Sequence, residues 1–309
     1  MTSFFKLIRF QNLAMIAFMQ LLFRYAFLEF SGIPLALNDW QYDLLVIATV
    51  LIAAGGYLIN NIFDQETDRI NKPQDVIVGK KITESLAYNL YAALNIAGVA
   101  IGFYLANLID KPGFAAIFIF TAGTLYLYAS SLKQSLLIGN FIISILCSLS
   151  IIIIGIFDLY PMIVPENSGL MSVTFKILLD YAFFCFMISL IRELVKDLED
   201  VDGDYNTGMS TLPIVLGVSR TVKVVLALTI IPIVYIVYYV NTYYIANDLL
   251  IAAGYTLLFI IAPLLYFAIK LWSAKKQKEF HHLSTVLKLV LLFGIISVAV
   301  VTFNIQRNA

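Results

Sequence analysis

The sequence predicts an all-α integral membrane protein, and three observations lead to this fold class. Of the 309 residues, 61% are hydrophobic. Charged residues make up 13% of the chain, against roughly a quarter of an ordinary soluble domain. Apolar stretches of about 20 residues, the length that crosses a bilayer, recur from one end of the chain to the other. We therefore expect the chain to be embedded in a lipid bilayer.

Nine apolar stretches are expected to form transmembrane helices. In chain order they cover residues 9–29, 43–63, 85–106, 113–129, 135–157, 171–191, 221–240, 246–271 and 286–305. The fourth is short and the eighth is long, so the count of nine depends on how these two cross the membrane. The first stretch is too long for the apolar part of a signal peptide and lacks a small-residue cleavage site, so we expect it to remain in the protein.

The distribution of basic residues predicts the orientation. If the N-terminus is cytoplasmic, sixteen of the twenty Lys and Arg residues fall on the cytoplasmic side. Such an excess is typical of cytoplasmic loops. We expect a protein of the cytoplasmic (inner) membrane with its N-terminus inside and its C-terminus outside. The formal net charge is zero, which argues against nucleic acid as a partner.

The chain is expected to form one membrane domain over residues 1–309, because no soluble-domain-sized polar insert interrupts the helices. Cys147 and Cys185 fall in the middle of predicted helices, where a thiol is usually a small buried apolar group. Two cytoplasmic loops, near residues 64–84 and 193–220, are long and each opens with acidic residues. Four predicted helices separate them, which suggests a four-helix pseudo-repeat.

The first acidic cluster follows the second predicted helix. Asn60, Asp64 and Asp68 recur every four residues, which places their side-chain oxygens on one face of a helix leaving the membrane. The two carboxylates repel each other at this spacing, and a hard divalent cation with oxygen ligands would offset the repulsion. The alternative is a solvated acidic helix end that pairs with Arg69 and Lys72.

The second acidic cluster follows the sixth predicted helix. Glu193, Asp197, Asp200 and Asp204 form an acidic stripe about three turns long. Carboxylates this dense at a membrane boundary are costly unless they are paired, bind metal or face a water-filled cavity. A solvated helix end is again the alternative. The spacing does not fit the calcium loop of an EF-hand.

Together the two clusters predict a magnesium and diphosphate site. Mg²⁺ commonly bridges a few carboxylates to phosphate oxygens. The predicted cation ligands are Asn60, Asp64, Asp68, Asp197, Asp200 and Asp204, and among them Asp64, Asp68, Asp200 and Asp204 are the predicted catalytic residues. Nearby basic residues that could add positive charge for the diphosphate are Arg69, Lys72, Lys80, Lys81, Lys133, Arg192 and Lys196.

A site of this kind suits the ionisation of an allylic diphosphate. Bound cations stabilise the negative charge of the leaving diphosphate. The carbocation that results survives only where water is excluded, and aromatic rings can stabilise it by cation–π contact. The 23 Phe and 18 Tyr residues are compatible with such a cavity, although aromatic residues are common in membrane helices for other reasons.

At these residues the sequence resembles the UbiA superfamily of membrane prenyltransferases. The first family motif matches Asn60, Asp64 and Asp68, and the second matches Asp200 and Asp204. The run KDLEDVDGD from Lys196 to Asp204, followed by Thr211, Leu212, Pro213 and Gly217, is similar to the branch that alkylates glycerol phosphate lipids, the digeranylgeranylglyceryl phosphate synthase-like branch. Other residues that resemble the family are Arg9, Asn12, Gln20, Tyr128, Lys133, Gly139 and Asn140.

The resemblance implies nine helices around a central cavity that opens toward the cytoplasm, Mg²⁺ as cofactor, and a polyprenyl diphosphate as donor. It adds Asn12 and Tyr128 to the expected diphosphate- or substrate-binding residues. The expected acceptor is lipophilic and of the glycerol phosphate type, with a geranylgeranyl group as the expected prenyl group. For the acceptor's own phosphate, basic residues such as Lys133 or Lys81 are the predicted partners.

Some positions depart from the family pattern. Many relatives have Asp in place of Asn61, and Arg-Pro-Ile in place of Asp75, Val76 and Ile77. This chain lacks the arginine of that Arg-Pro-Ile sequence, which would contact the diphosphate. We expect Lys72, Lys80 or Lys81 to make this contact instead.

Three other functions stay open on the sequence alone. One is prenyl transfer to an aromatic acid or quinone precursor. Another is cation-coupled transport, which also uses acidic residues in membrane helices and internal repeats, although here the acids gather at one face. The third is a scaffold with a decayed site, which would be expected to have lost these acids.

Overall fold

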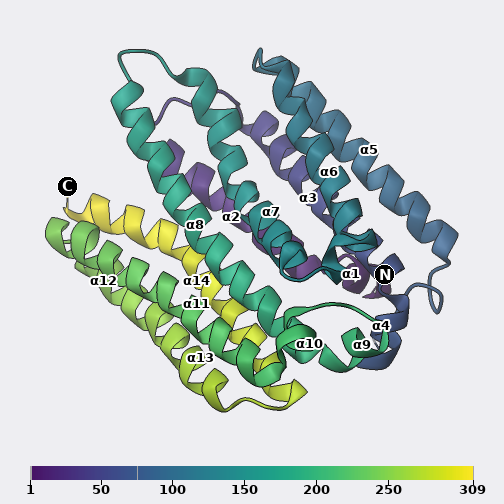
Figure 1. Cartoon of the computed structure of the whole chain (residues 1–309). Helices are drawn as coiled ribbons and strands as arrows, with labels where there is room; N and C mark the ends of the chain where they lie inside the picture. The colour runs from purple at the N-terminus through teal and green to yellow at the C-terminus, as the bar shows by residue number, and fades with distance from the viewer. Residues whose placement is uncertain (1, 75, 309) are drawn as a thin grey trace.

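The computed structural model describes residues 2–74 and 76–308, and within them the fold is a bundle of long helices (Figure 1). The helices of the first half are α1 Thr2–Leu7, α2 Phe10–Leu21, η1 Leu22–Glu29, α3 Asp39–Phe63, α4 Gln65–Asn71, α5 Glu84–Leu108, η2 Pro112–Phe114, α6 Ala115–Ser130, η3 Leu132–Gln134, α7 Ile138–Ile154, η4 Gly155–Leu159 and η5 Tyr160–Met162. Those of the second half are α8 Ser168–Glu199, α9 Val201–Asn206, α10 Leu212–Leu216, α11 Val218–Tyr239, η6 Val240–Tyr244, η7 Ile245–Asn247, α12 Leu250–Thr256, η8 Leu257–Ile261, α13 Ala262–Ser273 and α14 Gln277–Asn308.

Eight helical segments of the described residues are long and apolar enough to cross a membrane. They correspond to the second through ninth predicted stretches, and they confirm a multi-helix membrane protein. The first predicted stretch, residues 9–29, folds as α2 followed directly by the π-helical η1. Its polar residues Gln11, Asn12, Gln20 and Arg24 make it less apolar than the other eight.

The helices begin and end where local chemistry requires it. Asn38 caps α3 by accepting a hydrogen bond from the backbone N–H of Gln41, whose side chain caps the Asn38 N–H in return. Thr83 caps α5 in a similar way through the N–H of Leu86. Gly217, at a φ of 83°, makes the turn between α10 and α11, a conformation open mainly to glycine.

The difference from the predicted boundaries that matters most for the site is in α8. Its helix extends to Glu199, whereas the predicted apolar stretch ends at residue 191. Glu193 and Asp197 therefore lie in the last turns of a membrane helix and are not in a loop. Because hydropathy falls at the first charged residue while helical hydrogen bonding continues, hydropathy alone ends the helix too early.

A buried ion pair lies far from the acidic loops. The Arg24 guanidinium contacts Asp158 Oδ2 at 2.6 Å, donates to the Leu37 carbonyl at 2.8 Å, and stacks 5.2 Å from the ring centre of Tyr42. Asp158 accepts a further hydrogen bond from the Leu37 N–H at 3.0 Å. These contacts satisfy charges that would otherwise be costly inside a membrane protein, and they join η1 to η4 and to the segment before α3.

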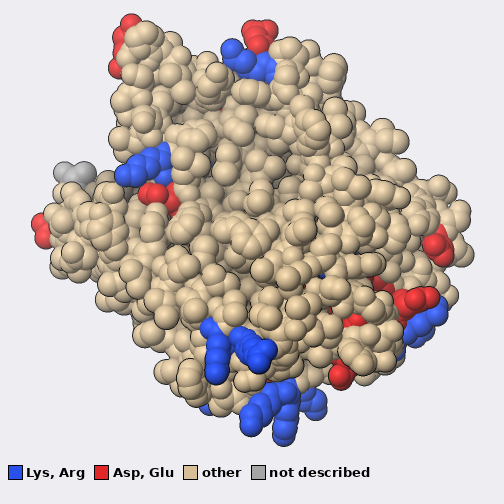
Figure 2. Space-filling view, in the orientation of Figure 1, with Lys and Arg blue, Asp and Glu red and all other residues tan. Residues whose placement is uncertain are grey.

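The acidic loops and the N-terminus lie at the same end of the bundle, while the C-terminus lies at the opposite end (Figure 1). The long α8 packs against α7, α11 and α14 in the interior. In the space-filling view the middle of the molecule is largely free of charge, and Lys and Arg gather at its lower end (Figure 2). The functional groups described below are built at this end.

Candidate functional site

The first acidic motif lies where α3 passes into α4. Asp64 joins the two helices with φ −85° and ψ 1°, in the sparsely populated region that active-site residues often occupy. The Asp64 N–H donates to the Asn60 carbonyl at 2.9 Å, and the Asp68 N–H donates to the Asp64 carbonyl at 2.8 Å. The three side chains are thereby kept one turn apart, as predicted. The Asn60 amide also donates to Asp64 Oδ2.

The second acidic motif repeats this arrangement where α8 passes into α9. Asp200 joins the two helices with φ −103° and ψ 13°, and the Asp204 N–H donates to the Asp200 carbonyl at 3.1 Å. One turn earlier, Asp197 accepts a hydrogen bond from the Asn140 amide at 2.9 Å. Asp64 and Asp200 therefore occupy equivalent positions, as the pseudo-repeat would require.

The structure brings the two motifs into direct contact, with α4 beside α9 (Figure 1). Lys72, which follows α4, contacts Asp200 Oδ1 at 2.9 Å and Glu199 Oε1 at 3.0 Å. The Asn71 amide donates to the Asp200 carbonyl at 3.1 Å and accepts from the Gly203 N–H at 2.8 Å. Gly203 is required here because a Cβ atom would lie 2.2 Å from Asn71 Nδ2.

Lysines balance the carboxylates of both motifs. Lys133, in η3, forms an ion pair with Asp64, and Lys72 forms an ion pair with Asp200. Burial acts to lower the pKa of Lys72, but the attraction of Asp200 and Glu199 outweighs it and the pKa is raised. Burial raises the pKa of Asp200, and Lys72 opposes that shift. Lys72 is thus held in its charged form beside the second motif.

Burial is the largest influence on the pKa of two further groups of the site, Lys133 and Asp204. It lowers the pKa of Lys133 to about 8, with Arg9 acting in the same direction and Asp204 against it. It raises the pKa of Asp204 to about 6, against a hydrogen bond that the Thr211 hydroxyl donates to Asp204 Oδ2 at 3.1 Å. Lys133 and Asp204 are therefore largely shielded from water.

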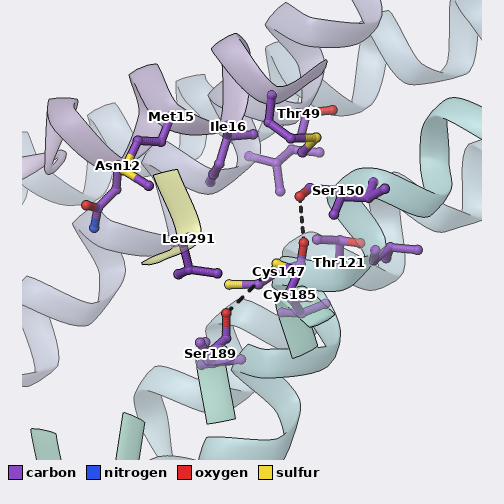
Figure 3. Close-up of a pocket in the computed structure, with 18 of the residues that line it drawn as sticks. Asn12, Met15, Ile16, Thr49, Thr121, Cys147, Ser150, Cys185, Ser189 and Leu291 are labelled. Carbon is purple, nitrogen blue, oxygen red and sulfur yellow. Dashed lines mark hydrogen bonds between the residues drawn. The ribbon is translucent and has the colours of Figure 1, made fainter. Parts of the chain in front are cut away.

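A cavity of about 270 Å³ opens beside the first motif and extends into the bundle. Its deeper wall is mainly apolar, with Met15 and Ile16 on one side and, across from them, Leu291 near the free thiols of Cys147 and Cys185 (Figure 3). Cys147 and Cys185 thus line the cavity and form no disulfide. Such a space excludes water and accepts an apolar chain.

Polar side chains gather at the part of the cavity nearest the acidic motifs. Asn12 donates to the Tyr57 hydroxyl at 3.0 Å, and the Arg9 guanidinium lies 5.3 Å from the centre of the Tyr57 ring. Polar or charged residues that line the cavity are Arg9, Asn12, Tyr57, Asn60, Tyr128, Arg192, Glu193, Lys196 and Lys288. The predicted residues Asn12, Asn60, Tyr128 and Lys196 are among them.

The residues of the two motifs fit a hard divalent cation that a diphosphate helps to bind. The Asn60 Oδ1 atom is buried and has no hydrogen-bond partner within the described residues, although a buried polar atom normally has one. In the part of the chain that the structure describes, no three acidic, His or Cys side chains gather into a complete ion site. Mg²⁺ commonly binds one or two carboxylates and takes its other oxygens from water and phosphate.

Three predicted diphosphate-binding residues are not brought to the acids. Arg69, Lys80 and Lys81 are exposed, and the Lys80 ammonium donates to the Pro73 carbonyl at 2.9 Å. Across residues 2–74 and 76–308, none of the three takes part in an ion pair. Asp75, the departure from the family pattern in this segment, lies outside the described residues.

The set of predicted binding residues also omitted cavity residues that the structure reveals. Glu193, predicted only as part of the acidic stripe, lines the cavity beside Arg192 and Lys196, which were both predicted to add positive charge. Lys288 also lines the cavity, and a lysine within an apolar stretch is itself a signal of function.

Comparison with known proteins places the chain among membrane prenyltransferases. A model of the UbiA prenyltransferase family matches residues 18–292. The digeranylgeranylglyceryl phosphate synthase of Methanobrevibacter smithii is 32% identical over 272 residues, which cover 86% of this chain and 89% of that protein.

Solved structures share the fold. One, from work on digeranylgeranylglyceryl phosphate synthase in membranes, aligns with a TM-score of 0.62 at 24% identity and covers 96% of this chain and 98% of that one. A UbiA homolog from Archaeoglobus fulgidus bound to GPP and Mg²⁺ aligns with a TM-score of 0.57 at 15% identity and covers 96% of this chain and 99% of that one.

Proposed function

The chain belongs to the UbiA prenyltransferase family, and from this premise we propose that it transfers a geranylgeranyl group from its diphosphate to the hydroxyl of a glycerol-phosphate prenyl lipid. The observation that supports the proposal most is the contact between the two acidic motifs beside a mainly apolar cavity. The name and alignment length of the Methanobrevibacter smithii relative support the glycerol phosphate acceptor.

The proposed reaction exchanges one C–O bond for another. The bond between C1 of the prenyl chain and the diphosphate breaks, the diphosphate leaves with the bonding electrons, and the acceptor oxygen bonds to C1 as its proton is released. Asn60, Asp64, Asp68, Asp200 and Asp204 are the proposed Mg²⁺ ligands, with Asp197 held behind them by Asn140. When bound, Mg²⁺ supplies positive charge that stabilises the leaving diphosphate.

The chain's own residues bind the donor and exclude water. Lys72 and Lys133 already contact carboxylates of the two motifs, so their ammonium groups are placed to contact diphosphate oxygens as well. The apolar part of the cavity, with Met15 and Leu291, is the proposed site of the prenyl tail. Tyr128 lines the cavity near the acids, where its ring could stabilise positive charge at C1.

We further propose a single membrane domain of nine spans, with α2 and η1 as the first and the cavity open toward the cytoplasm. The N- and C-termini at opposite ends of the bundle require an odd number of crossings (Figure 1). The gathering of Lys and Arg at the end with the acidic loops favours a cytoplasmic position for that end (Figure 2).

The acceptor can be tested by competition. Purified enzyme is given geranylgeranyl diphosphate and Mg²⁺ with geranylgeranylglyceryl phosphate, 4-hydroxybenzoate or dihydroxynaphthoate, and the lipid products are identified by mass spectrometry. We expect alkylation of the glycerol phosphate lipid, and its loss when a chelator removes the metal. Efficient alkylation of an aromatic acceptor alone would refute the proposed acceptor, while product formation in chelator would refute the proposed metal site.

A further inference from the structure

Four basic side chains line one part of the cavity mouth. Arg9 lies between α1 and α2, Arg192 and Lys196 lie in the last turns of α8, and Lys288 lies in α14. Three segments that are far apart in sequence therefore bring four positive charges to one place. Arg192 and Lys196 both contact Glu193, and all four cations line the same cavity.

The carboxylate within this group does not balance its charge. Glu193 Oε1 contacts Lys196 Nζ at 2.5 Å and Arg192 Nη1 at 3.6 Å, and its single charge can neutralise only one of the four cations. The other contacts are to neutral groups. Arg192 donates to the Ser284 carbonyl at 3.3 Å, and Lys288 donates to Gln11 Oε1 at 3.2 Å.

Such a surplus of positive charge on a partly buried wall favours an anionic ligand. Like charges near one another in a region of low dielectric repel more strongly than in water, and an anion between them removes that cost. Arginine offers a planar pair of N–H groups that matches two phosphate oxygens, and lysine adds a point charge. The chemistry of the group therefore fits a phosphate.

This phosphate site adjoins the place proposed for the donor's diphosphate, and different cations serve each. The lysines that contact the metal-site acids Asp64 and Asp200 are Lys133 and Lys72. Arg192 precedes Asp200 by eight residues in the sequence, which in a helix is about 12 Å along the axis. The group of cations therefore begins at Lys196, one turn from Asp200, and reaches Arg192, one turn further along α8.

The cavity wall changes from cationic to apolar within a turn or two of each cation. Leu291 lies one turn beyond Lys288 in α14, and Met15 and Ile16 lie about two turns beyond Arg9 in α2. In α8 the cavity-lining residues one and two turns before Arg192 are Ser189 and Cys185 (Figure 3). An anionic headgroup with apolar chains attached would match this order.

We propose that Arg9, Arg192 and Lys288, with Lys196 beside them, bind the phosphate of the acceptor lipid. The proposal rests on the proposed function, in which the acceptor is a phosphate ester. It replaces the expectation that Lys133 or Lys81 holds this phosphate, because Lys133 lies beside Asp64, where the donor's diphosphate is proposed to bind, and Lys81 is exposed. A phosphate bound here directs the acceptor's hydroxyl toward the donor and its chain along the apolar wall.

The test compares two acceptors that differ only in the phosphate. Geranylgeranylglyceryl phosphate and geranylgeranylglycerol are offered to the wild type, Arg192→Gln and Lys288→Gln, with Lys278→Gln as control because Lys278 is an exposed lysine of the same helix. We expect Arg192→Gln and Lys288→Gln to raise KM for the phosphorylated acceptor about tenfold or more, with KM for the donor and the use of geranylgeranylglycerol unchanged. A rise in the donor KM instead, or no change in any KM, would overturn the proposal.

A binding measurement separates this proposal from the proposed function. If the wild type does not alkylate geranylgeranylglyceryl phosphate, the proposed function fails, but the lipid can still be tested for its effect on thermal unfolding in detergent. Stabilisation of the wild type and Lys278→Gln, with a much smaller effect on Lys288→Gln, would support the phosphate site. Equal stabilisation of all three would contradict it. The unfolding curves without lipid also show whether each variant is folded.

Discussion

Asp64 and Asp200 each end a long membrane helix with nearly the same backbone conformation, and each is followed one turn later by a second aspartate. The spacing in the sequence was enough to predict that Asp64 and Asp68 share a helical face. It could not predict that Lys133 pairs with Asp64 or that Lys72 pairs with Asp200, because these contacts join residues 69 and 128 positions apart.

Substitution of the four aspartates tests the site at the residue scale. We expect Asp64→Ala, Asp68→Ala, Asp200→Ala and Asp204→Ala each to lower kcat by roughly 10²–10³, the effect of removing one electrostatic stabiliser of a developing charge. Steady-state kinetics with saturating donor and acceptor measures this.

Asp202→Ala is the matched control, because Asp202 is an exposed acid between Asp200 and Asp204. It should keep near-normal turnover. Near-normal turnover in two of the four site variants would show that these acids do not form the reaction centre.

At the scale of elements, the decisive feature is that α4 packs on α9. The predicted long loops are partly helical, and the Asn71 side chain bridges them by bonding to the Asp200 carbonyl and the Gly203 N–H. Because the two aspartates of each motif are rigidly attached to these short helices, the position of α9 on α4 sets the distance between the motifs. A glycine at position 203 leaves the space that this contact needs.

Gly203→Ala should therefore disturb the reaction without removing any acid. The added Cβ would lie 2.2 Å from Asn71 Nδ2, so the Asn71 side chain must move and its hydrogen bonds to the Asp200 carbonyl and the Gly203 N–H are disturbed. We expect a fall in kcat of up to roughly 10²-fold and a higher Mg²⁺ concentration for half-maximal activity, measured by titrating Mg²⁺ in the turnover assay.

Gly169→Ala in α8 is the control, since a Cβ there meets open space. Wild-type behaviour of Gly203→Ala in the Mg²⁺ titration would mean that the packing of α4 on α9 does not control the site.

At the scale of the whole molecule, the two ends of the bundle differ. The acidic motifs and the N-terminus share one end, and the C-terminus lies at the other (Figure 1). The buried Arg24–Asp158 pair lies beside Asp39, at the start of α3, whereas Asp64 lies at the end of α3. The largely uncharged band between them agrees with a membrane position (Figure 2). The proposed site therefore lies at one end of the bundle.

Accessibility mapping tests which side of the membrane this end faces. On a background without Cys147 and Cys185, single cysteines replace Gln74 and Thr207 beside the acidic motifs, and Glu166 in the loop before α8. If the acidic loops are cytoplasmic, an impermeant thiol reagent added to intact cells should label only the Glu166 position, and the other two after lysis. Labelling of Gln74 or Thr207 positions in intact cells would reverse the proposed orientation.

The sequence by itself determined the helical membrane class, eight of the membrane helices, and the two acidic motifs with their spacing. These depend on hydropathy and on the period of the helix, which are local properties. Tertiary structure alone decided which basic residues face the cavity and which are exposed. Lys80 and Lys81 are as basic as Lys288, yet only Lys288 lines the cavity. The position of a charge in the site depends on how helices from distant parts of the chain pack against one another. The local sequence around a lysine does not contain these contacts, so it cannot predict them.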